Sequence, residues 1–90
     1  MTVSVVVPFA SDDPTRRRAR DYVRAWWESN GFEVVEGSCD EPWRKAVAVA
    51  DAVRRSDGEI LVVADADVVI NDPFVIDEAV AAVRDQAPWV

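Results

Sequence analysis

The sequence predicts an α/β domain of three αβα layers, in which helices cover both faces of a small parallel sheet with strand order 2-1-3. Three short runs of apolar, mostly β-branched residues alternate with three longer segments whose apolar residues recur at helical spacing. Strands that alternate with helices of ten or more residues need crossover connections, and these make the strands parallel. The sequence shows no linker, repeat or low-complexity segment, so we expect one domain over residues 1–90.

The first strand and helix have clear boundaries in the sequence. Residues 2–9, TVSVVVPF, are apolar and β-branched, and Pro8 near their end stops the strand ladder. Asp13 and Pro14 then supply an N-cap and a first helical residue. Asn and Gly at residues 30–31 end the helix. Its apolar stripe follows the i, i+3, i+4, i+7, i+8 pattern and consists of Ala19, Tyr22, Val23, Trp26 and Trp27.

The second strand and helix follow at once. Residues 32–37, FEVVEG, predict a short strand that a glycine closes. Asp40 and Pro42 lie in the start signal of the next helix, and Asp-Gly at residues 57–58 ends it. We expect the apolar face of this helix to pack on the sheet, with Trp43 more as a core residue than as part of a site. That face consists of Trp43, Ala46, Val47, Ala50 and Val53.

Residues 60–64 predict the third strand, and the runs VVVP and ILVV suggest strands that are buried on both faces. Ligands of such sheets bind beyond the carboxyl ends of the strands, where the strand order reverses. This rule places the expected site between residues 8–10 and residues 65–67. A third helix is expected to be capped by Asn71, Asp72 and Pro73 and to bury Ile76, Ala79, Val80 and Val83.

Composition narrows the possible partners and chemistry. A net charge of −7 argues against nucleic acid or an anionic membrane as a general partner, and we expect no membrane span because no apolar run is long enough. The absence of histidine removes Ser-His-Asp and Cys-His catalysis and histidine zinc sites. The single Cys39 cannot form an intrachain disulfide, and no secretory signal opens the sequence, so we expect a cytoplasmic protein.

Two aspartates, Asp65 and Asp67, follow the third apolar run. Side chains at i and i+2 of a strand point to one face, so the two carboxylates can converge at the carboxyl edge of the sheet. Converging carboxylates repel each other unless a cation lies near them, and Mg²⁺ and Mn²⁺ bind such ligands together with substrate phosphates. The alternative is that both aspartates belong to a turn and cap its backbone.

The neighbours of these aspartates carry a more specific pattern. Residues 43–68, WRKAVAVADAVRRSDGEILVVADADV, contain W-x-K-A-x-A followed by G-E-x-L-x-x-x-D-A-D. With the opening VSVVVPF, this segment resembles the nucleotide-binding half of GT-A fold glycosyltransferases of the family 2 type, close to the polypeptide N-acetylgalactosaminyl- and galactosyl-transferases. The resemblance covers nearly the whole sequence but only the N-terminal half of such a domain, and it implies a truncated GT-A, Rossmann-like nucleotide-diphospho-sugar transferase fold.

The resemblance also implies roles for individual residues. Asp67 would hold a divalent metal, Mn²⁺ or Mg²⁺, that bridges the two phosphates of a nucleoside-diphosphate sugar, with UDP-sugars favoured. Asp65 would contact the ribose or share the metal. The nucleoside would lie against Pro8, Phe9 and Ala10. Its base or ribose would contact Glu36, and the diphosphate or sugar would contact Lys45.

Three functions stay open at this point. The first is transfer of the sugar from the nucleotide to an unknown acceptor, although the half of the family fold that supplies the catalytic base, and in many members a histidine ligand, is not seen in the sequence. The second is a non-catalytic or partner-completed sugar-nucleotide-binding module. The third is a nucleotidyltransferase-like protein, which the lack of a Gly-rich first loop weakens. A flavodoxin-like or receiver-type domain would need more strand-helix units.

We also expect self-association or completion by another chain. In the complete family fold further strands continue past the aspartate-bearing strand, so residues 60–64 would form an open edge here. Trp26, Trp27 and Trp89 carry more aromatic surface than a small core easily covers, and we expect at least one to be buried against another chain. The arginines of the first helix are expected to form a solvated face with nearby aspartates; they are Arg16, Arg17, Arg18 and Arg20, beside Asp12, Asp13 and Asp21.

Overall fold

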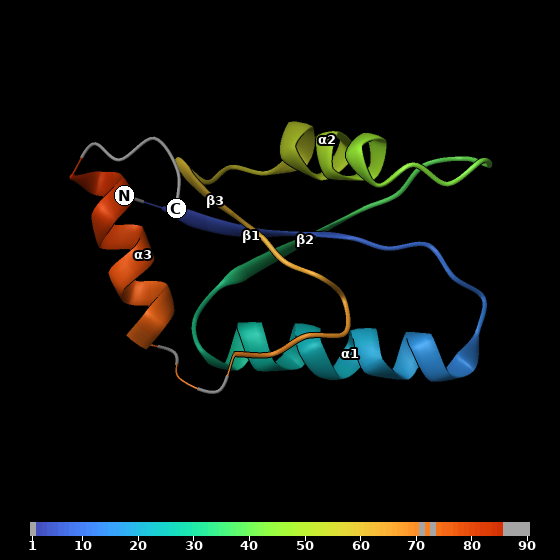
Figure 1. Ribbon diagram of the computed structural model, residues 1–90, viewed down its shortest axis with the longest axis horizontal. Coiled ribbons are helices and arrows are strands. Elements are labelled where there is room, and N and C mark those ends of the chain that lie inside the picture. Colours follow the sequence, from blue (N-terminus) through green and yellow to red (C-terminus); the bar gives the residue numbers. More distant parts are fainter. Residues whose placement is uncertain (1, 71, 73, 86–90) are drawn as a thin grey trace.

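The computed structural model describes residues 2–70, 72 and 74–85, which form an open parallel sheet with helices on both sides (Figure 1). Among these residues the sheet has three strands in the order β2-β1-β3, and both neighbours of β1 run parallel to it. The predicted α/β class and strand order are therefore confirmed. The elements in chain order are β1 (Val3–Pro8), α1 (Pro14–Ser29), β2 (Glu33–Gly37), α2 (Lys45–Arg55), β3 (Ile60–Val63) and α3 (Phe74–Arg84).

The boundaries of α1 agree with the predicted caps. The Asp13 carboxylate accepts a hydrogen bond from the Thr15 backbone N–H at 2.8 Å, which satisfies one of the free donors at the start of the helix. At the other end Gly31 has φ = 86°, a left-handed conformation that glycine adopts without a steric penalty. The short local signals in the sequence therefore fix where α1 begins and ends.

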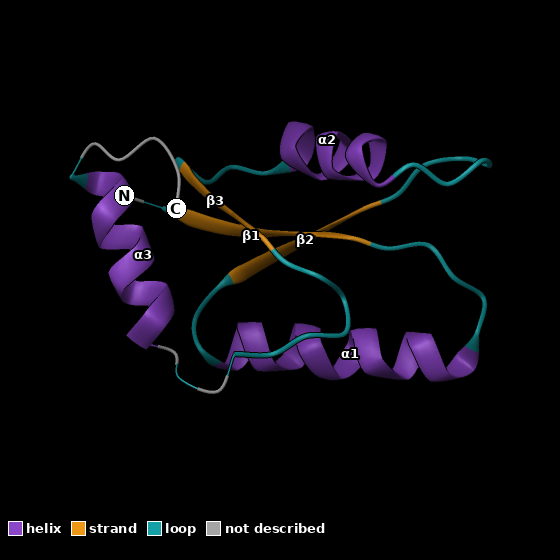
Figure 2. Cartoon of the chain, viewed as in Figure 1, coloured by secondary structure: helices purple, strands orange, loops and turns teal. Residues whose placement is uncertain are grey.

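The main core lies between the sheet and the helices α1 and α3, whereas α2 covers the opposite face (Figure 2). Trp27 of α1 is fully buried there and meets Phe32 edge to face, with ring centroids 5.4 Å apart. Trp26 is half-buried against the same core, so both tryptophans are accommodated within one chain. The third tryptophan of the self-association argument, Trp89, lies outside the described residues.

The predicted sheet-facing side of α2 is wrong. Ala48 and Ala52 are the buried residues of this helix, while Trp43, Val47 and Val53 are all exposed. The reason is a close approach to the end of β2: a Cβ atom added to Gly37 would lie 1.9 Å from the Ala48 carbonyl oxygen. Only the smallest side chains fit between the two backbones, so the larger apolar residues of the helix turn away from the sheet.

The prediction that β3 is buried on both faces is also wrong. Ile60 is buried in the main core, but Leu61 and Val63 on the other face are 37% and 57% exposed. The cause is the position of α2, which packs on β2 and β1 and leaves that face of β3 uncovered by the described residues. This strand therefore alternates between a buried and an exposed side, although its sequence is uniformly apolar.

Helix α3 buries Ile76 and Val80, and Val83 is partly buried against the same core, so three of the four residues expected to face the core do so. The Asp72 carboxylate accepts a hydrogen bond from the Phe74 backbone N–H at 3.0 Å, as a capping residue does. The other predicted cap residues, Asn71 and Pro73, lie outside the described residues. Within the described part of the chain, no helix combines the length and apolar character needed to cross a membrane.

Candidate functional site

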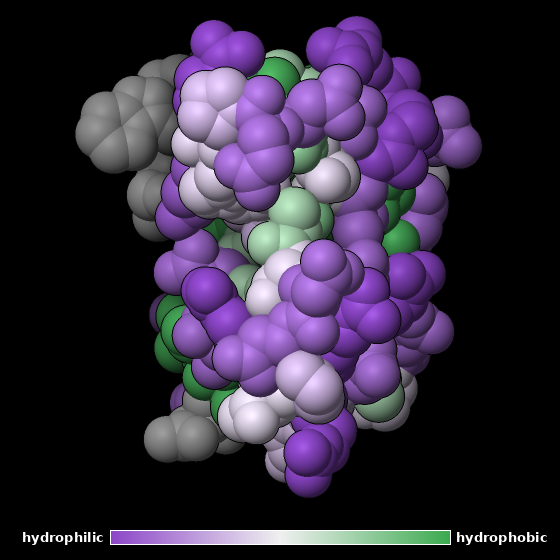
Figure 3. All heavy atoms as spheres, turned by 90° about the vertical axis from the view of Figure 1, so that its right-hand side faces the viewer, coloured by the Kyte–Doolittle hydropathy of each residue, from purple (hydrophilic) through white to green (hydrophobic). Residues whose placement is uncertain are grey.

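A cleft of about 560 Å³ opens at the edge of the sheet where the strands end. We call it the aspartate cleft. Figure 3 views the molecule from this side and shows mostly hydrophilic residues around a paler, more apolar centre. The end of β1, three loops, the first two turns of α1 and the start of α2 form its wall: Pro8, Phe9, Ala10, Thr15, Arg16, Ala19, Trp43, Lys45, Asp65, Ala66 and Asp67.

The structure brings Asp65 and Asp67 to this cleft, but not by strand alternation. The strand β3 ends at Val63, one further ladder bond joins the Ala64 N–H to the Val6 carbonyl at 3.0 Å, and Ala66 and Asp67 then form a turn. The expectation that both carboxylates point from one strand is therefore corrected to a turn, although neither aspartate caps the backbone of a described residue, as the alternative had it. Both side chains are exposed and line the same cleft.

Lys45 also reaches this cleft, from the first turn of α2. Its Nζ atom lies 2.8 Å from Oδ1 of Asp65, so the pair joins the start of α2 to the turn after β3. A second cation, Arg16 of α1, lines the same cleft. The cleft thus offers two carboxylates and two cationic side chains to a ligand.

Trp43 was expected mainly in the core, and this expectation is wrong. The residue precedes α2, is 43% exposed and lines the aspartate cleft beside Lys45. Its indole ring gives the cleft an apolar wall against which a ribose or sugar ring can pack. Helical spacing predicted Trp43 as part of the apolar face of α2, but the residue lies before the helix begins, so its spacing was the misleading signal.

A second cleft of about 420 Å³ shares Phe9 and Ala10 with the first. We call it the glutamate cleft because Glu36, at the end of β2, lies in its wall. The two clefts are neighbours on either side of the loop after β1. The remaining residues of this wall come from that loop, from α1 and from the end of β2: Ser11, Asp12, Arg17, Arg20, Gly37 and Ser38.

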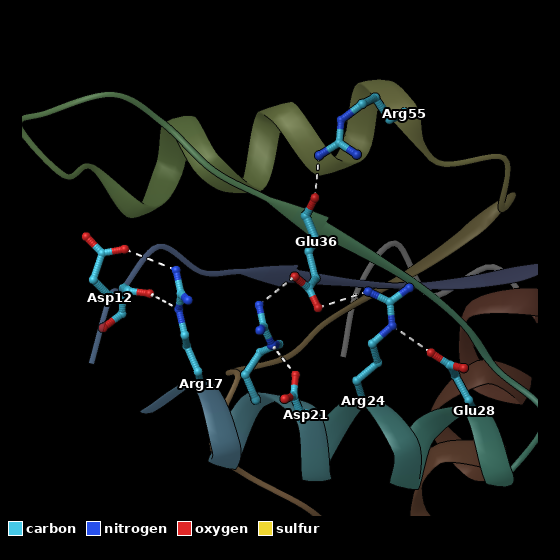
Figure 4. A network of polar contacts seen from close by, with 9 residues as sticks. Asp12, Arg17, Asp21, Arg24, Glu28, Glu36 and Arg55 are labelled. Carbon is cyan, nitrogen blue, oxygen red and sulfur yellow. Dashed lines mark hydrogen bonds and ion pairs between the residues drawn. The ribbon is translucent and has the colours of Figure 1, made fainter. Parts of the chain in front are cut away.

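Glu36 is held by α1 (Figure 4). Its two carboxylate oxygens accept from Arg20 at 3.2 Å and from Arg24 at 2.9 Å, and its side chain is only 24% exposed. Arg20 also lies 4.8 Å above the centre of the Phe9 ring, in a cation–π contact. The carboxylates of Glu28 and Glu36 raise the pKa of Arg24 above its usual value.

The arginine pairs expected on α1 are partly confirmed. Arg17 pairs with Asp12 at 3.1 Å, and Arg20 pairs with Asp21 at 2.7 Å. The bonds from α1 to Glu36 were not expected, because they join a helix to the next strand and no local sequence pattern encodes that register. The first helix therefore contributes to the glutamate cleft as well as to the solvated surface.

Asp51 fixes α2 to the end of β2. Its carboxylate accepts the Ser38 backbone N–H at 3.1 Å and pairs with Arg54 and Arg55 of its own helix. Arg55 in turn donates to the Glu36 backbone carbonyl. The hydrogen bond from Arg55, together with that from Ser38, lowers the pKa of Asp51 below its ordinary value of 3.8. No local sequence pattern connects this aspartate with the strand end that carries Glu36.

The donor set of the aspartate cleft fits Mg²⁺ or Mn²⁺ only together with a phosphate ligand. Within the described ranges, no group of three or more His, Cys, Asp or Glu residues is placed to hold a metal ion. Asp65 and Asp67 supply two carboxylates, and Mg²⁺ is commonly held by one or two carboxylates plus substrate phosphates and water. Such a site is completed by its ligand.

We compared the chain with known families, curated proteins and solved structures, and no family model, curated protein or solved structure matches it.

Proposed function

We propose that this protein binds a nucleoside-diphosphate sugar at the two adjoining clefts, through a divalent metal at Asp65 and Asp67. The observation that carries the proposal is the convergence of Phe9, Lys45 and the two aspartates in one cleft at the carboxyl edge of the sheet. This edge is where parallel α/β sheets bind their ligands. The motif that resembles family 2 glycosyltransferases supports the same function.

The division into two clefts supports a placement of the ligand. The aspartate cleft would hold the diphosphate and sugar, because it contains the metal-binding carboxylates and the cations Arg16 and Lys45. The glutamate cleft would hold the nucleoside, with Phe9 between the two parts. Glu36 and Arg20 present an acceptor beside a donor. Uracil, with an imide N–H between two carbonyl oxygens, can meet both groups, and the preference for UDP rests on the family resemblance.

The chain's own residues bind and orient the donor in this proposal. A bound Mn²⁺ or Mg²⁺ would stabilise the charge of the leaving diphosphate. Asp67 would hold the ion, and Asp65 would share it or bond to the ribose. When an acceptor is also bound, the reaction is transfer of the sugar from the nucleoside diphosphate to that acceptor, which makes the protein a glycosyltransferase.

A non-catalytic or partner-completed binding module is the second candidate. It is favoured by the outer edge of β3, which pairs with no described strand, and by the exposed side chains of Leu61 and Val63. A second copy of the chain could pair at this edge and cover both residues. Sedimentation velocity at micromolar concentration tests this association, and a monomer across that range would argue against it.

Calorimetry tests the donor site. UDP, GDP and their sugars are titrated into the protein with Mn²⁺ and again with EDTA. We expect binding that needs Mn²⁺, is tighter for UDP than for GDP, and is lost in Asp67→Asn. A matched control is Asp57→Asn, which removes an exposed aspartate from the opposite end of the sheet, before β3. If no nucleotide binds in any arm, the proposed function is wrong. If one binds, transfer or hydrolysis assays separate an enzyme from a binding module.

A further inference from the structure

Lys45 is the only lysine in the sequence, and its ammonium already occupies one carboxylate of the proposed metal site. The Nζ atom lies 2.8 Å from Oδ1 of Asp65. A divalent ion that binds Asp65 therefore has to displace or share this contact. In contrast, no hydrogen bond or ion pair joins Asp67 to another described residue, so the two aspartates differ in how freely they can take a metal.

The contact between Lys45 and Asp65 is readily exchanged. The two side chains are 59% and 55% exposed, and ion pairs this open to water contribute little to stability. The amide N–H groups at the start of a helix carry partial positive charge, which disfavours a lysine and favours an anion there. The N-cap, Arg44, forms no side-chain capping bond that would offset this charge. A diphosphate would satisfy both the ammonium and the helix start.

We propose that Lys45 exchanges partners, from Asp65 in the free protein to the diphosphate in the complex, and so releases Asp65 for the metal. This inference rests on the proposed donor site. Lys45 then acts as the resident cation of the cleft, which holds the Asp65 carboxylate until the charged ligand arrives. Without nucleotide, the metal has to compete with the Lys45 ammonium for the Asp65 carboxylate. Without metal, the diphosphate of the nucleotide gains the ammonium as a binding partner. The exchange thereby links the binding of the two ligands.

Removal of the ammonium should change the two single-ligand affinities in opposite directions. Mn²⁺ is titrated by calorimetry without nucleotide, and UDP without metal, into wild type and Lys45→Met. Site binding is the part of the Mn²⁺ signal that Asp67→Asn abolishes. We expect Lys45→Met to bind Mn²⁺ up to about fivefold more tightly, the upper value for an exposed ion pair, and to bind UDP more weakly.

Arg54→Met is the matched control for charge. It removes one positive charge from the same helix, at a 70% exposed side chain that lies about two and a half turns from Lys45. We expect this variant to change both affinities by less than Lys45→Met does. Equal or weaker Mn²⁺ binding in Lys45→Met, or unchanged UDP binding, would overturn the exchange.

Because the sequence contains a single lysine, an NMR signal from its side chain can report directly which group it contacts. Reductive ¹³C-methylation labels Lys45 and the N-terminal amine with retention of charge, and the signal that Lys45→Met lacks identifies the lysine. We expect this NMR signal to shift in Asp65→Asn and to shift again when Mg²⁺ and UDP are added. A signal that does not respond to Asp65→Asn would show that the pair does not form in solution.

The arms of the experiment separate the two claims. If wild type binds no UDP even with Mn²⁺, the donor site is wrong and the exchange fails with it. If wild type binds UDP with Mn²⁺, but the lysine signal ignores Asp65→Asn or the two affinities of Lys45→Met move in the same direction, only the exchange is overturned.

Discussion

Gly37→Ala should loosen α2 and weaken the site at the same time. The new Cβ atom would lie 1.9 Å from the Ala48 carbonyl oxygen and 2.9 Å from the Ala52 Cβ. These are backbone and buried atoms, so the helix itself has to move. Overpacking of this kind typically costs about 1–3 kcal/mol, and we expect the upper end here because no flexible side chain can yield. A domain of this size has a total stability of about 5–13 kcal/mol, so the loss is large.

Urea denaturation followed by circular dichroism measures this loss. The same displacement of α2 would draw Lys45 out of the aspartate cleft, where it is proposed to bind the diphosphate, so we expect UDP binding with Mn²⁺ to weaken together with stability. Gly31→Ala is the matched control: apart from its two chain neighbours, the new Cβ meets no atom within 4 Å, but it strains a left-handed backbone, at a cost of about 1 kcal/mol. The close-approach argument would be refuted by a Gly37→Ala variant within about 0.5 kcal/mol of wild type.

Three further substitutions test other parts of the account. Asp51→Asn should destabilise the fold at pH 7, because a lowered pKa adds stability that is present above pH 3.8 and is lost as pH falls through the pKa of the folded state. Urea denaturation across pH should show the difference in stability from wild type vanish in acid, and a constant difference would contradict this. Glu36→Gln keeps the shape of the side chain but loses its charge and weakens its pairs with Arg20 and Arg24, so we expect weaker UDP binding by calorimetry; an unchanged UDP affinity would remove Glu36 from nucleoside binding. Val63→Lys places a charge on the outer face of β3 and should shift any dimer seen by sedimentation to monomer without loss of folding, whereas a persistent dimer would place the interface elsewhere.

The elements that were predicted correctly are those whose signals are local. Asp13 and Gly31 mark the ends of α1 through their own backbone chemistry, and the alternation of strands and helices determines the parallel sheet. Neither conclusion requires knowledge of the tertiary contacts between elements. The position of the cleft also follows from topology alone, because the carboxyl ends of parallel strands share one edge.

The elements that were predicted wrongly depend on distant contacts. Helical spacing put Val47 and Val53 against the sheet, but the absence of a side chain at Gly37 allows an approach that only alanines fit. The bonds from Arg20 to Glu36 likewise depend on how α1 lies across β2, which no pattern within either element encodes. The roles predicted for Pro8 and Ala10, and for Asp65 and Asp67 as metal ligands, stay predictions, although the structure places all four residues in one cleft.

The most direct test of the donor site is the location of bound Mn²⁺ in the presence of UDP. Mn²⁺ broadens the NMR signals of nearby backbone amides, so a ¹⁵N spectrum of the complex reports which residues surround the ion. We predict the strongest broadening at residues 65–67, weaker broadening at residues 8–10 and 43–45, and little in α3. Broadening centred instead on Asp12 and Asp13, or on Asp40 and Glu41, with residues 65–67 unaffected, would contradict a metal site at the end of β3.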